Sequence, residues 1–435
     1  MKRDIYAQLL VWKNKPKRKS LILKGARQVG KTFIIKKFAE TEYQNYIYIN
    51  FDENRVIHKL FEENISVKKI INDLSLLNSA IIEPQKTLII FDEIQECPNA
   101  LNSLKYFTEN EVDYHVIAAG SLLGVWLNNS RGFPVGKVNF LELYPLNFFE
   151  FLEAINRLDL RNYLESINHA KPLSEPIHLE LQRYLKEYLY VGGMPSVVNQ
   201  YIESSNKYQD VRIEQNEILA GYEHDFSKYT DKFEAIKISK IWNSLVAQLT
   251  KENKKFIFSV LRKGTRAKDY EYSLEWLINA GLVYKIQNIS NPKYPLDAFA
   301  TSNIFKLYFV DVGLLGAKCN LSAKTIIDGN SLFESFKGAI IENYVLQELI
   351  KKLGKSIYYW TSEGEAEVDF LLSHNENSYP LEVKAGISKK KKSLAIYGMK
   401  YSPPILSRTT SMNLIKDGNI LNYPLYLINL FPEIH

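Results

Sequence analysis

The sequence predicts an α/β protein that begins with a parallel sheet and ends with a second α/β region. In the first third of the chain, short apolar runs alternate with helical patterns, and each run has the length of a strand buried within a sheet. Strands that alternate with helices form crossover units, which build parallel sheets. The strand-like runs cover residues 21–25, 46–51, 87–93 and 115–121, and a helical pattern covers residues 32–40.

Composition and charge exclude several classes of protein. The chain has 435 residues, of which 46% are hydrophobic and 24% are charged, as in ordinary globular proteins. The net charge is only +6, so contacts with nucleic acid are expected through local basic patches. Two cysteines, Cys97 and Cys319, cannot form a disulfide framework and favour a reducing cytoplasm. No signal segment is visible, and the apolar stretch at 116–127 is too short to span a bilayer, so we expect no membrane partner.

The rest of the chain divides by pattern into three parts. From residue 146 to about residue 240 the pattern is helical, with a break at VGGMP. A shorter part is predicted to contain helices followed by a strand. The final part mixes a long helical pattern with several strands and follows a segment with two prolines. We therefore predict four domains, with bounds at 1–150, 151–240, 241–295 and 296–435.

The first candidate site is a glycine-rich loop. GARQVGKT fits G-x-x-x-x-G-K-[ST], follows a predicted strand and opens a predicted helix. Its glycines let the backbone curl so that successive N–H groups point inward, and the helix amino terminus adds positive potential. Lys31 would reach the β- and γ-phosphates, and Thr32 would offer its hydroxyl to Mg²⁺. The loop therefore predicts a P-loop NTPase domain with ATP and Mg²⁺ as cofactors, the nucleotide being held by Gly25, Ala26, Arg27, Gln28, Val29, Gly30, Lys31 and Thr32.

Two carboxylates end the third strand-like run, TLIIFDE. They emerge at the carboxyl end of a buried strand, where ligands of open parallel sheets bind. Asp92 would hold the Mg²⁺ shell, and Glu93 would accept a proton from the attacking water or orient it. An exposed acidic turn is the alternative interpretation, and the pairing with the phosphate loop favours the catalytic one.

A polar residue, Ser121, ends the fourth run. In P-loop ATPases of the AAA+ type, the strand beside the acidic one carries a residue that touches the γ-phosphate or the water, and Ser121 is placed to be this sensor. Serine is also a favoured helix N-cap, and the two roles are compatible. Arg131 and Lys137 are candidates for the cation that stabilises charge on the γ-phosphoryl group. Both are otherwise ordinary solvated charges, and the cation can instead come from another subunit.

The second candidate site lies near the carboxyl terminus. EVDFLL, a polar turn and YPLEVKAG predict a hairpin that brings Asp369 beside Glu382 and Lys384. Two carboxylates can hold a divalent metal, and a lysine can orient a water that attacks a phosphodiester. Glu342, on a predicted helix, would add a further metal ligand. This order is the D…ExK arrangement of PD-(D/E)xK nucleases, so we expect a restriction-endonuclease-like α/β domain; a merely solubilising strand face is the alternative.

The middle of the chain carries a basic cluster. Residues 254–286 contain two helical patterns, a glycine stop and a strand, an order that fits a winged helix. A DNA-reading helix would begin at the turn between the two patterns. A small helical module that only packs domains together is the alternative. The candidate DNA-binding residues at this turn are Arg262, Lys263, Arg266 and Lys268.

These segments, in this order, resemble a known family. GARQVGKT, LIIFDEIQ, GSLLG, YPLNFFEFL, YVGGMP, HDFSKY and EVDFLL…LEVKAG are similar to the prokaryotic AAA+ ATPases whose C-terminal domain of unknown function is related to PD-(D/E)xK nucleases. The resemblance covers nearly the whole chain. It implies an ATPase core, a helical lid, a winged helix and a nuclease-like domain. Many relatives carry Gly-Arg after the sensor strand, where this chain has Gly136-Lys137, so the resemblance does not supply the catalytic cation.

The sequence thus predicts a cytoplasmic ATPase that binds and hydrolyses ATP with Mg²⁺ and acts on DNA. Glu93, Ser121 and Lys31 are the predicted catalytic residues of the ATPase, and Lys384 is that of the nuclease-like domain. DNA is the expected partner, and a homo-oligomer is the alternative to Arg131 and Lys137 as the source of the catalytic cation. The alternative is a nucleotide-dependent regulator or scaffold whose nuclease-like domain binds nucleic acid or protein without cleaving it.

Overall fold

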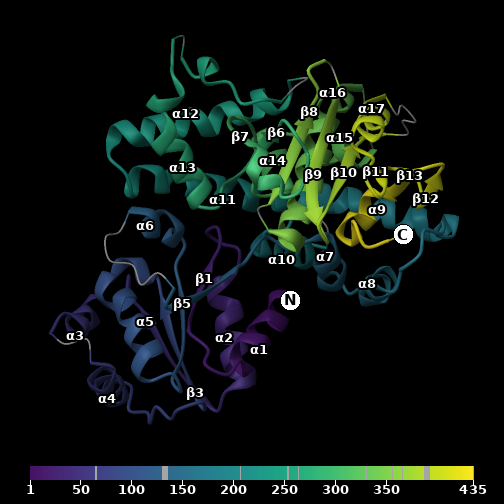
Figure 1. The fold of residues 1–435 in the computed structure, drawn as a ribbon. Helices are drawn as coiled ribbons and strands as arrows, with labels where there is room; N and C mark the ends of the chain where they lie inside the picture. Colours follow the sequence, from purple (N-terminus) through teal and green to yellow (C-terminus); the bar gives the residue numbers. More distant parts are fainter. Residues whose placement is uncertain are drawn as a thin grey trace. The chain divides into compact units, whose positions relative to one another are not determined.

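In the computed structural model the chain forms two compact units (Figure 1). The amino-terminal unit comprises Lys2–Tyr144 together with Asn279–Leu282, and the carboxy-terminal unit comprises Pro145–Ile278 and Val283–His435. The finer division into four domains remains a prediction. The structure describes residues 1–63, 66–129, 136–205, 207–251, 254–262, 264–328, 331–354, 356–364, 366–386 and 392–434.

A five-stranded parallel sheet forms the centre of the amino-terminal unit. Its strand order is β2-β3-β4-β1-β5, and every neighbouring pair is parallel. The predicted parallel sheet is therefore confirmed, with one strand more than the four predicted runs. The order places β4 between β1 and β3. The strands are β1 (Ser20–Lys24), β2 (Asn45–Asn50), β3 (Thr87–Asp92), β4 (His115–Ala119) and β5 (Val138–Glu142).

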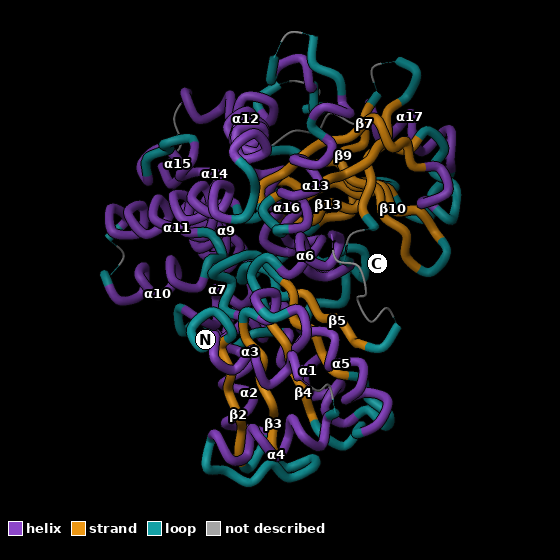
Figure 2. Tube along the Cα trace, turned by 90° about the vertical axis from the view of Figure 1, so that its left-hand side faces the viewer, coloured by secondary structure: helices purple, strands orange, loops and turns teal. Residues whose placement is uncertain are grey.

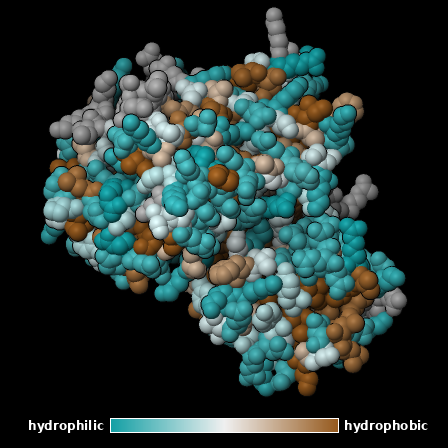
Figure 3. Space-filling model, turned by 180° about the vertical axis from the view of Figure 1, so that it is seen from behind, coloured by the Kyte–Doolittle hydropathy of each residue, from teal (hydrophilic) through white to brown (hydrophobic). Residues whose placement is uncertain are grey.

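Helices cover both faces of this sheet (Figures 1 and 2). α2 lies on one side and α5 on the other, so the central strands lose contact with water on both faces. All six side chains of β3 are buried for this reason, which explains its continuous apolar run. Apolar side chains gather on one outer face of the unit (Figure 3, lower right). The helices are α1 (Ile5–Asn14), α2 (Lys31–Glu42), α3 (His58–Glu63), α4 (Val67–Leu77), α5 (Pro98–Asn110) and α6 (Leu123–Asn129).

The carboxy-terminal unit begins with helices, as the pattern from residue 146 predicts. The break at VGGMP separates α9 from α10, because Gly192 has φ +78° and Pro195 opens the next helix. A side chain at Gly192 would also place its Cβ 2.2 Å from Oδ1 of Asp311. The helices are α7 (Phe148–Ala154), α8 (Leu158–Glu165), α9 (Glu175–Val191), α10 (Pro195–Glu203), α11 (Tyr208–Lys228), α12 (Lys232–Leu249) and α13 (Glu271–Asn279).

An eight-stranded mixed sheet forms the second part of this unit, in the order β12-β13-β11-β10-β9-β8-β6-β7. The hairpin predicted around Asp369 is present, because β9 and β10 pair antiparallel. The strands are β6 (Val283–Ile289), β7 (Ala300–Phe309), β8 (Ile357–Thr361), β9 (Glu367–His374), β10 (Asn377–Val383), β11 (Leu406–Thr410), β12 (Ile415–Asp417) and β13 (Ile420–Pro424). The accompanying helices are α14 (Val312–Lys318), α15 (Ala323–Asp328), α16 (Ser331–Leu353) and α17 (Lys392–Tyr401).

The segment predicted to be a winged helix differs from expectation. Of its two helical patterns, the second forms α13, whereas the first contains a single-turn 3₁₀ helix at Phe258–Val260. The following strand, β6, pairs with β7 and with β8, so it extends the C-terminal sheet. This pairing buries Val283, Ile286 and Ile289, which a short isolated wing would leave exposed. Among the described residues, no helix is long and apolar enough to cross a membrane.

Candidate functional site

The glycine-rich loop joins β1 to α2 through an unusual backbone path. Gly25, Gln28 and Gly30 have φ values of +147°, +67° and +93°. A Cβ at Gly25 would lie 2.3 Å from the carbonyl oxygen of Leu143, so both the conformation and the space require glycine there. The loop leads directly into the amino terminus of a 12-residue helix, as the motif predicts. The backbone therefore forms the amide-lined turn that suits a phosphate group.

Lys31 is folded back into this loop. Its ammonium donates hydrogen bonds to the carbonyl oxygens of Gly25 (2.9 Å) and Ala26 (2.8 Å). The residue is buried, with only 6% of its surface exposed. Burial lowers the pKa of Lys31 to about 8, although the carboxylates of Glu93 and Asp92 act in the opposite direction. An incoming phosphate would offer this ammonium the negative partner that the two carbonyls only partly replace.

Asp92 and Thr32 lie side by side at the end of β3. The hydroxyl of Thr32 donates to Oδ2 of Asp92 over 2.7 Å, and the hydroxyl of Tyr48 donates to the same oxygen over 2.9 Å. The second carboxylate oxygen accepts the backbone N–H of Glu93 at 3.1 Å. A hydroxyl and a carboxylate are the hard oxygen ligands that Mg²⁺ prefers, so the residues present fit this cation.

Glu93 and Ser121 also meet, because β4 lies beside β3. Both the backbone N–H and the hydroxyl of Ser121 lie 3.4 Å from Oε2 of Glu93, and Gln95 donates to that oxygen over 2.5 Å. Glu93 has φ +48°, a conformation that non-glycine residues adopt rarely and mostly where the surroundings enforce it. The structure thus brings together the two residues that the sequence places 28 positions apart.

Two residues of this site were not predicted. Tyr48 lies on β2, and Gln95 lies on the 3₁₀ turn after β3. Gln95 is nearly buried, and a Cβ at Gly120 would lie 2.0 Å from its Oε1 atom. Glycine at position 120 therefore makes room for Gln95 against Glu93. The only sequence signal was that Gln95 follows the acidic pair by two positions.

The two candidate cations of this unit have different outcomes. Lys137 forms an ion pair of 2.8 Å with Glu109 on α5, which agrees with the interpretation of an ordinary surface charge. Arg131 lies outside the residues that the structure describes.

The carboxy-terminal candidate residues are close together and mostly buried. One carboxylate oxygen of Asp369 on β9 accepts the backbone N–H of Val383 at 2.7 Å, and Lys384 pairs with Glu382 at 2.8 Å. Glu342, on α16, is 2% exposed. The electrostatic neighbours of Asp369 include Glu342 and Lys384. The predicted proximity of these residues is therefore present, and their catalytic and metal-binding roles remain predictions.

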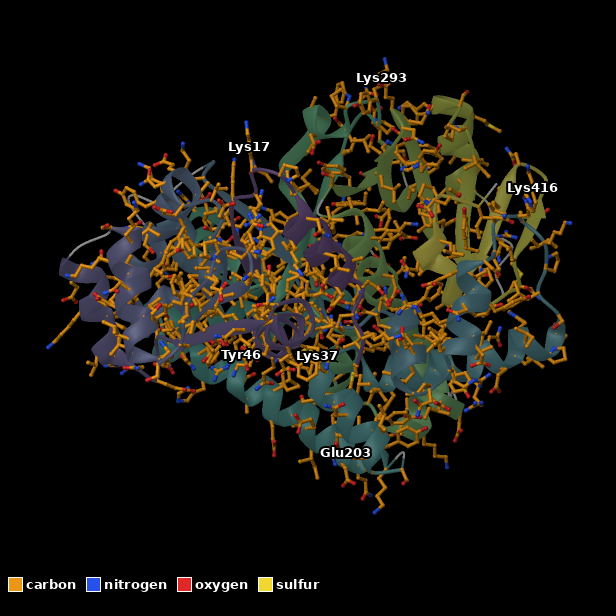
Figure 4. The ribbon with its side chains drawn as sticks, turned by 90° about the horizontal axis from the view of Figure 1, so that it is seen from below. Lys17, Lys37, Tyr46, Glu203, Lys293 and Lys416 are labelled. Atoms are coloured by element: carbon orange, nitrogen blue, oxygen red, sulfur yellow. The ribbon has the colours of Figure 1, made fainter. Side chains whose placement is uncertain are left out.

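Two lysines and a tyrosine that were not predicted enter this site. Lys306, on β7, pairs with Glu342 at 3.4 Å and with Glu367 at 2.6 Å. Glu342 also contacts the ammonium of Lys254 and the hydroxyl of Tyr308. Lysines usually lie on the outside, as Lys17, Lys293 and Lys416 do in Figure 4, whereas the side chain of Lys306 is 1% exposed.

The charges of this cluster perturb one another. Burial alone would raise the pKa of Glu342, but Lys306 and Lys254 outweigh burial and hold the pKa below its usual range. Burial and the charge of Glu342 raise the pKa of Asp369 above the usual value. Within the described parts of the chain, no three His, Cys, Asp or Glu side chains converge closely enough to hold a metal ion. Lysine ammonium groups, instead, balance these carboxylates.

The basic cluster lies at the predicted turn. Arg262, Arg266 and Lys268 are exposed, whereas Lys263 lies outside the described residues. The backbone N–H of Arg266 donates to Asp269 at 3.0 Å, which fixes the turn before α13 and leaves the side chains facing solvent. Contact with DNA at these residues stays a prediction.

Comparison with known protein families agrees with this geometry. Residues 17–152 match the family described as AAA domain. Its span includes the loop, Asp92, Glu93 and Ser121, and it ends eight residues after Tyr144, the end of the first segment of the amino-terminal unit. The parallel sheet and the loop lie within the part of the chain that is similar to the AAA domain family. Residues 182–325 and 337–426 match two domains of unknown function, DUF8612 and DUF4143.

The solved structures that match this chain do so at low sequence identity and with TM-scores below 0.5. The Walker-type ATPase PABY2304 of Pyrococcus abyssi is 13% identical, with coverage of 73% of this chain and 95% of that one and a TM-score of 0.45. Aeropyrum pernix ORC1 in complex with DNA is 14% identical, with coverage of 74% and 93% and a TM-score of 0.27. Thermotoga maritima RuvB, a Holliday junction branch migration motor, is 15% identical, with coverage of 64% and 88% and a TM-score of 0.29. A search of curated proteins gave no match.

Proposed function

We propose that this protein binds ATP with Mg²⁺ and hydrolyses it in the amino-terminal unit. One observation carries the proposal. The phosphate loop, the pair Asp92 and Glu93, and Ser121 follow the carboxyl ends of β1, β3 and β4, which are neighbours in one parallel sheet. Ligands of such sheets bind at this edge.

Binding would use the amides of the loop and the ammonium of Lys31. The N–H groups at the start of α2 have no partners within the helix, and they can donate to phosphate oxygens. Lys31 would exchange the carbonyl oxygens of Gly25 and Ala26 for the β- and γ-phosphates. Because Lys31 is already buried, little further desolvation of its ammonium accompanies binding.

Thr32 and Asp92 would hold the magnesium ion. When bound, Mg²⁺ neutralises charge on the β- and γ-phosphate oxygens and so favours departure of ADP. Tyr48 keeps one oxygen of Asp92 in place, and the N–H of Glu93 keeps the other. These contacts fix the carboxylate before the cation arrives.

Glu93 would accept the proton of the water that attacks the γ-phosphorus. The bond from water oxygen to phosphorus forms, the bond from phosphorus to the ADP oxygen breaks, and ADP and inorganic phosphate leave. Gln95 and Ser121 hold Oε2 of Glu93, which leaves Oε1 for the water. Because Lys137 is paired with Glu109, the cation that stabilises charge on the γ-phosphoryl group would come from Arg131 or from a second copy of the chain.

Titration calorimetry with ATP tests the proposal. Wild-type protein should bind ATP with Mg²⁺ at micromolar concentrations, and Lys31→Ala should abolish binding. Lys137→Ala is a matched control, since its partner Glu109 lies outside the candidate site. Absence of nucleotide affinity in a folded wild-type protein would refute the proposed activity.

We further propose that ATP turnover is coupled to DNA binding in the carboxy-terminal unit. The exposed cations Arg262, Arg266 and Lys268 support a phosphate-backbone contact. Binding of single-stranded, duplex and branched DNA should weaken as salt rises, because each neutralised phosphate releases counterions. If no DNA form binds at low salt, a protein-partner switch replaces this proposal.

The second candidate function is that of a scaffold or regulator whose C-terminal domain does not cleave DNA. Lysine neutralisation of Glu342 and Glu367 favours this alternative, because it leaves fewer free carboxylates for a metal. Cleavage assays with Mg²⁺ and Mn²⁺ distinguish the two. Cleavage by wild type that is lost in Asp369→Ala and Glu382→Ala establishes a nuclease, and DNA binding without cleavage establishes the scaffold.

A further inference from the structure

A short turn from the second half of the sequence packs within the amino-terminal unit. Residues Asn279–Leu282 connect α13 to β6, and they belong to the same compact unit as the phosphate loop. Ala280 and Leu282 are both buried, so the turn is part of the packed interior and does not lie loosely on the surface. These four residues form the α13–β6 turn.

The α13–β6 turn lies against the phosphate loop at Gly281. This residue has φ +72°, in the left-handed region that glycine adopts readily. A Cβ at this position would lie 3.3 Å from the backbone nitrogen of Ala26 and 3.6 Å from its Cα atom. The carbonyl oxygen of Ala26 accepts a hydrogen bond from the ammonium of Lys31 over 2.8 Å. Gly281 therefore packs against the residue that holds Lys31 inside the loop.

The α13–β6 turn also lies against α6, at Asn279. A Cβ at Gly124 would lie 2.1 Å from the carbonyl oxygen of Asn279, far inside van der Waals contact, so only glycine allows the two backbones to approach this closely. α6 begins two residues after Ser121, whose hydroxyl lies 3.4 Å from Oε2 of Glu93. The phosphate loop and the connection that carries Ser121 thus reach the same four residues through two different elements.

Both ends of the turn continue into well-packed elements. The rings of Trp276 on α13 and Phe226 on α11 have centroids 5.5 Å apart, and the hydroxyl of Ser273 on α13 donates to Glu234 on α12 over 2.7 Å. On the other side of the turn, β6 pairs with β7 and with β8. Closely packed interiors transmit strain, so a shift of the turn acts on α13 and on β6.

We propose that the α13–β6 turn supports the phosphate loop and couples nucleotide occupancy to α13 and β6. The inference rests on the proposed binding of ATP. When Lys31 exchanges the carbonyl oxygen of Ala26 for phosphate oxygens, Ala26 loses a hydrogen bond and its contact with Gly281 changes. The coupling is reciprocal, because a nucleotide that changes the turn must bind with an affinity that depends on the turn. The nucleotide site thereby depends on four residues outside the AAA match at 17–152.

Hydrogen–deuterium exchange of the full-length protein tests the coupling. The probe is β,γ-imido-ATP with Mg²⁺, at a concentration that titration calorimetry shows to be saturating. Amides of residues 280–289 should exchange several-fold more slowly with this nucleotide than without it. Amides of β13, which four strands separate from β6 in the sheet order, should exchange at the same rate in both conditions.

Two glycine substitutions separate support of the loop from backbone strain. Gly281→Ala and Gly418→Ala both place alanine at positive φ, +72° and +65°, but a Cβ at Gly418 would meet no atom within 4 Å. Gly281→Ala should raise the Kd for β,γ-imido-ATP about tenfold, as loss of one hydrogen bond to a charged group would, and should abolish the change in exchange. Gly418→Ala should keep the Kd and the exchange rates of the wild type.

Exchange in the wild-type protein decides the question even where Gly281→Ala does not fold. Saturating nucleotide that leaves exchange of residues 280–289 unchanged would overturn the inference, and so would a folded Gly281→Ala protein with the wild-type Kd. Absence of nucleotide binding to the wild-type protein is a different result, which calorimetry detects before any exchange is measured. It would refute the proposed ATP site, and the coupling with it.

Discussion

The hydroxyl of Thr32 lies 2.7 Å from Oδ2 of Asp92, and this bond joins two residues 60 positions apart in the chain. It links the phosphate loop to the strand that carries both carboxylates. The same oxygen accepts the hydroxyl of Tyr48, so two hydroxyl groups orient Asp92. Side chains that are fixed before a ligand arrives need little rearrangement when it binds.

We expect Thr32→Val to lower ATP turnover strongly. Valine keeps the shape of threonine and removes the oxygen that would contact Mg²⁺, and a hydrogen bond to a charged group contributes about 1.5–3 kcal/mol, or roughly ten- to hundredfold. Steady-state phosphate release measured against Mg²⁺ concentration checks this. Thr32→Ser retains the hydroxyl and should stay near wild type; equal loss in both variants would contradict a ligand role.

Glu93→Gln should bind ATP and turn it over slowly. Glutamine cannot accept the proton of the attacking water, and general-base catalysis typically contributes about 10²–10⁴-fold. Calorimetry should give wild-type affinity, and a phosphate-release assay should give the slowed rate. Hydrolysis at the wild-type rate would show that Glu93 is not the base.

Gln95→Ala should reduce the rate less than Glu93→Gln, by about tenfold. Gln95 holds Oε2 of Glu93 over 2.5 Å, so its loss frees the carboxylate to turn without removing it, and a hydrogen bond to a charged group contributes about 1.5 kcal/mol at the lower end of its range. The expected signature is a fall in kcat with little change in KM. A change in KM alone would place Gln95 in nucleotide binding.

Binding of ATP with Mg²⁺ should take up protons near pH 8. Burial lowers the pKa of Lys31 to about 8, so the free protein holds this ammonium only partly protonated at that pH. Phosphate oxygens raise the pKa again, and linkage requires uptake of about half a proton. Calorimetry at pH 8 in buffers of different ionisation enthalpy measures it. At pH 6.5, where Lys31 is already charged, its contribution should vanish; identical uptake at both values would assign the proton elsewhere.

Lys306→Met should destabilise the carboxy-terminal unit by about 3–5 kcal/mol, because it leaves Glu342 and Glu367 facing each other without their shared buried cation. Chemical denaturation measures the change. The double variant Lys306→Met/Glu342→Gln should recover part of the loss, since the uncompensated charge is gone. Additive losses in the double variant would show that packing, not charge, determines the effect.

Most of the prediction for the amino-terminal unit depended on local sequence patterns. The loop GARQVGKT and the carboxylates after β3 depend on residues within one strand and one turn, and these are readable from the chain alone. A strand that is buried on both faces can also be predicted from the sequence, because it has a continuous apolar run, as β3 does. The meeting of Glu93 with Ser121 followed from one added assumption, that their strands are neighbours.

The features that were not predicted depend on contacts between residues far apart in the sequence. Lys306 sits in a strand whose sequence, ATSNIFKLYF, suggests an exposed lysine, and only the packing of β7 near α16 makes it a buried partner of Glu342. The strand expected to close a winged helix instead pairs with β8, about 70 positions further along the chain. Neither contact can be predicted from local periodicity, because each depends on a residue far away in the sequence.

The insertion of β4 between β1 and β3 has a mechanical consequence. Ser121 ends the connection from β4, and α6 starts two residues later at Leu123. If the proposed hydrolysis changes the hydrogen bonds of Glu93, the change would act on Ser121, two residues before the first turn of α6. This short helix is therefore where we expect loss of the third phosphate to act first on the backbone.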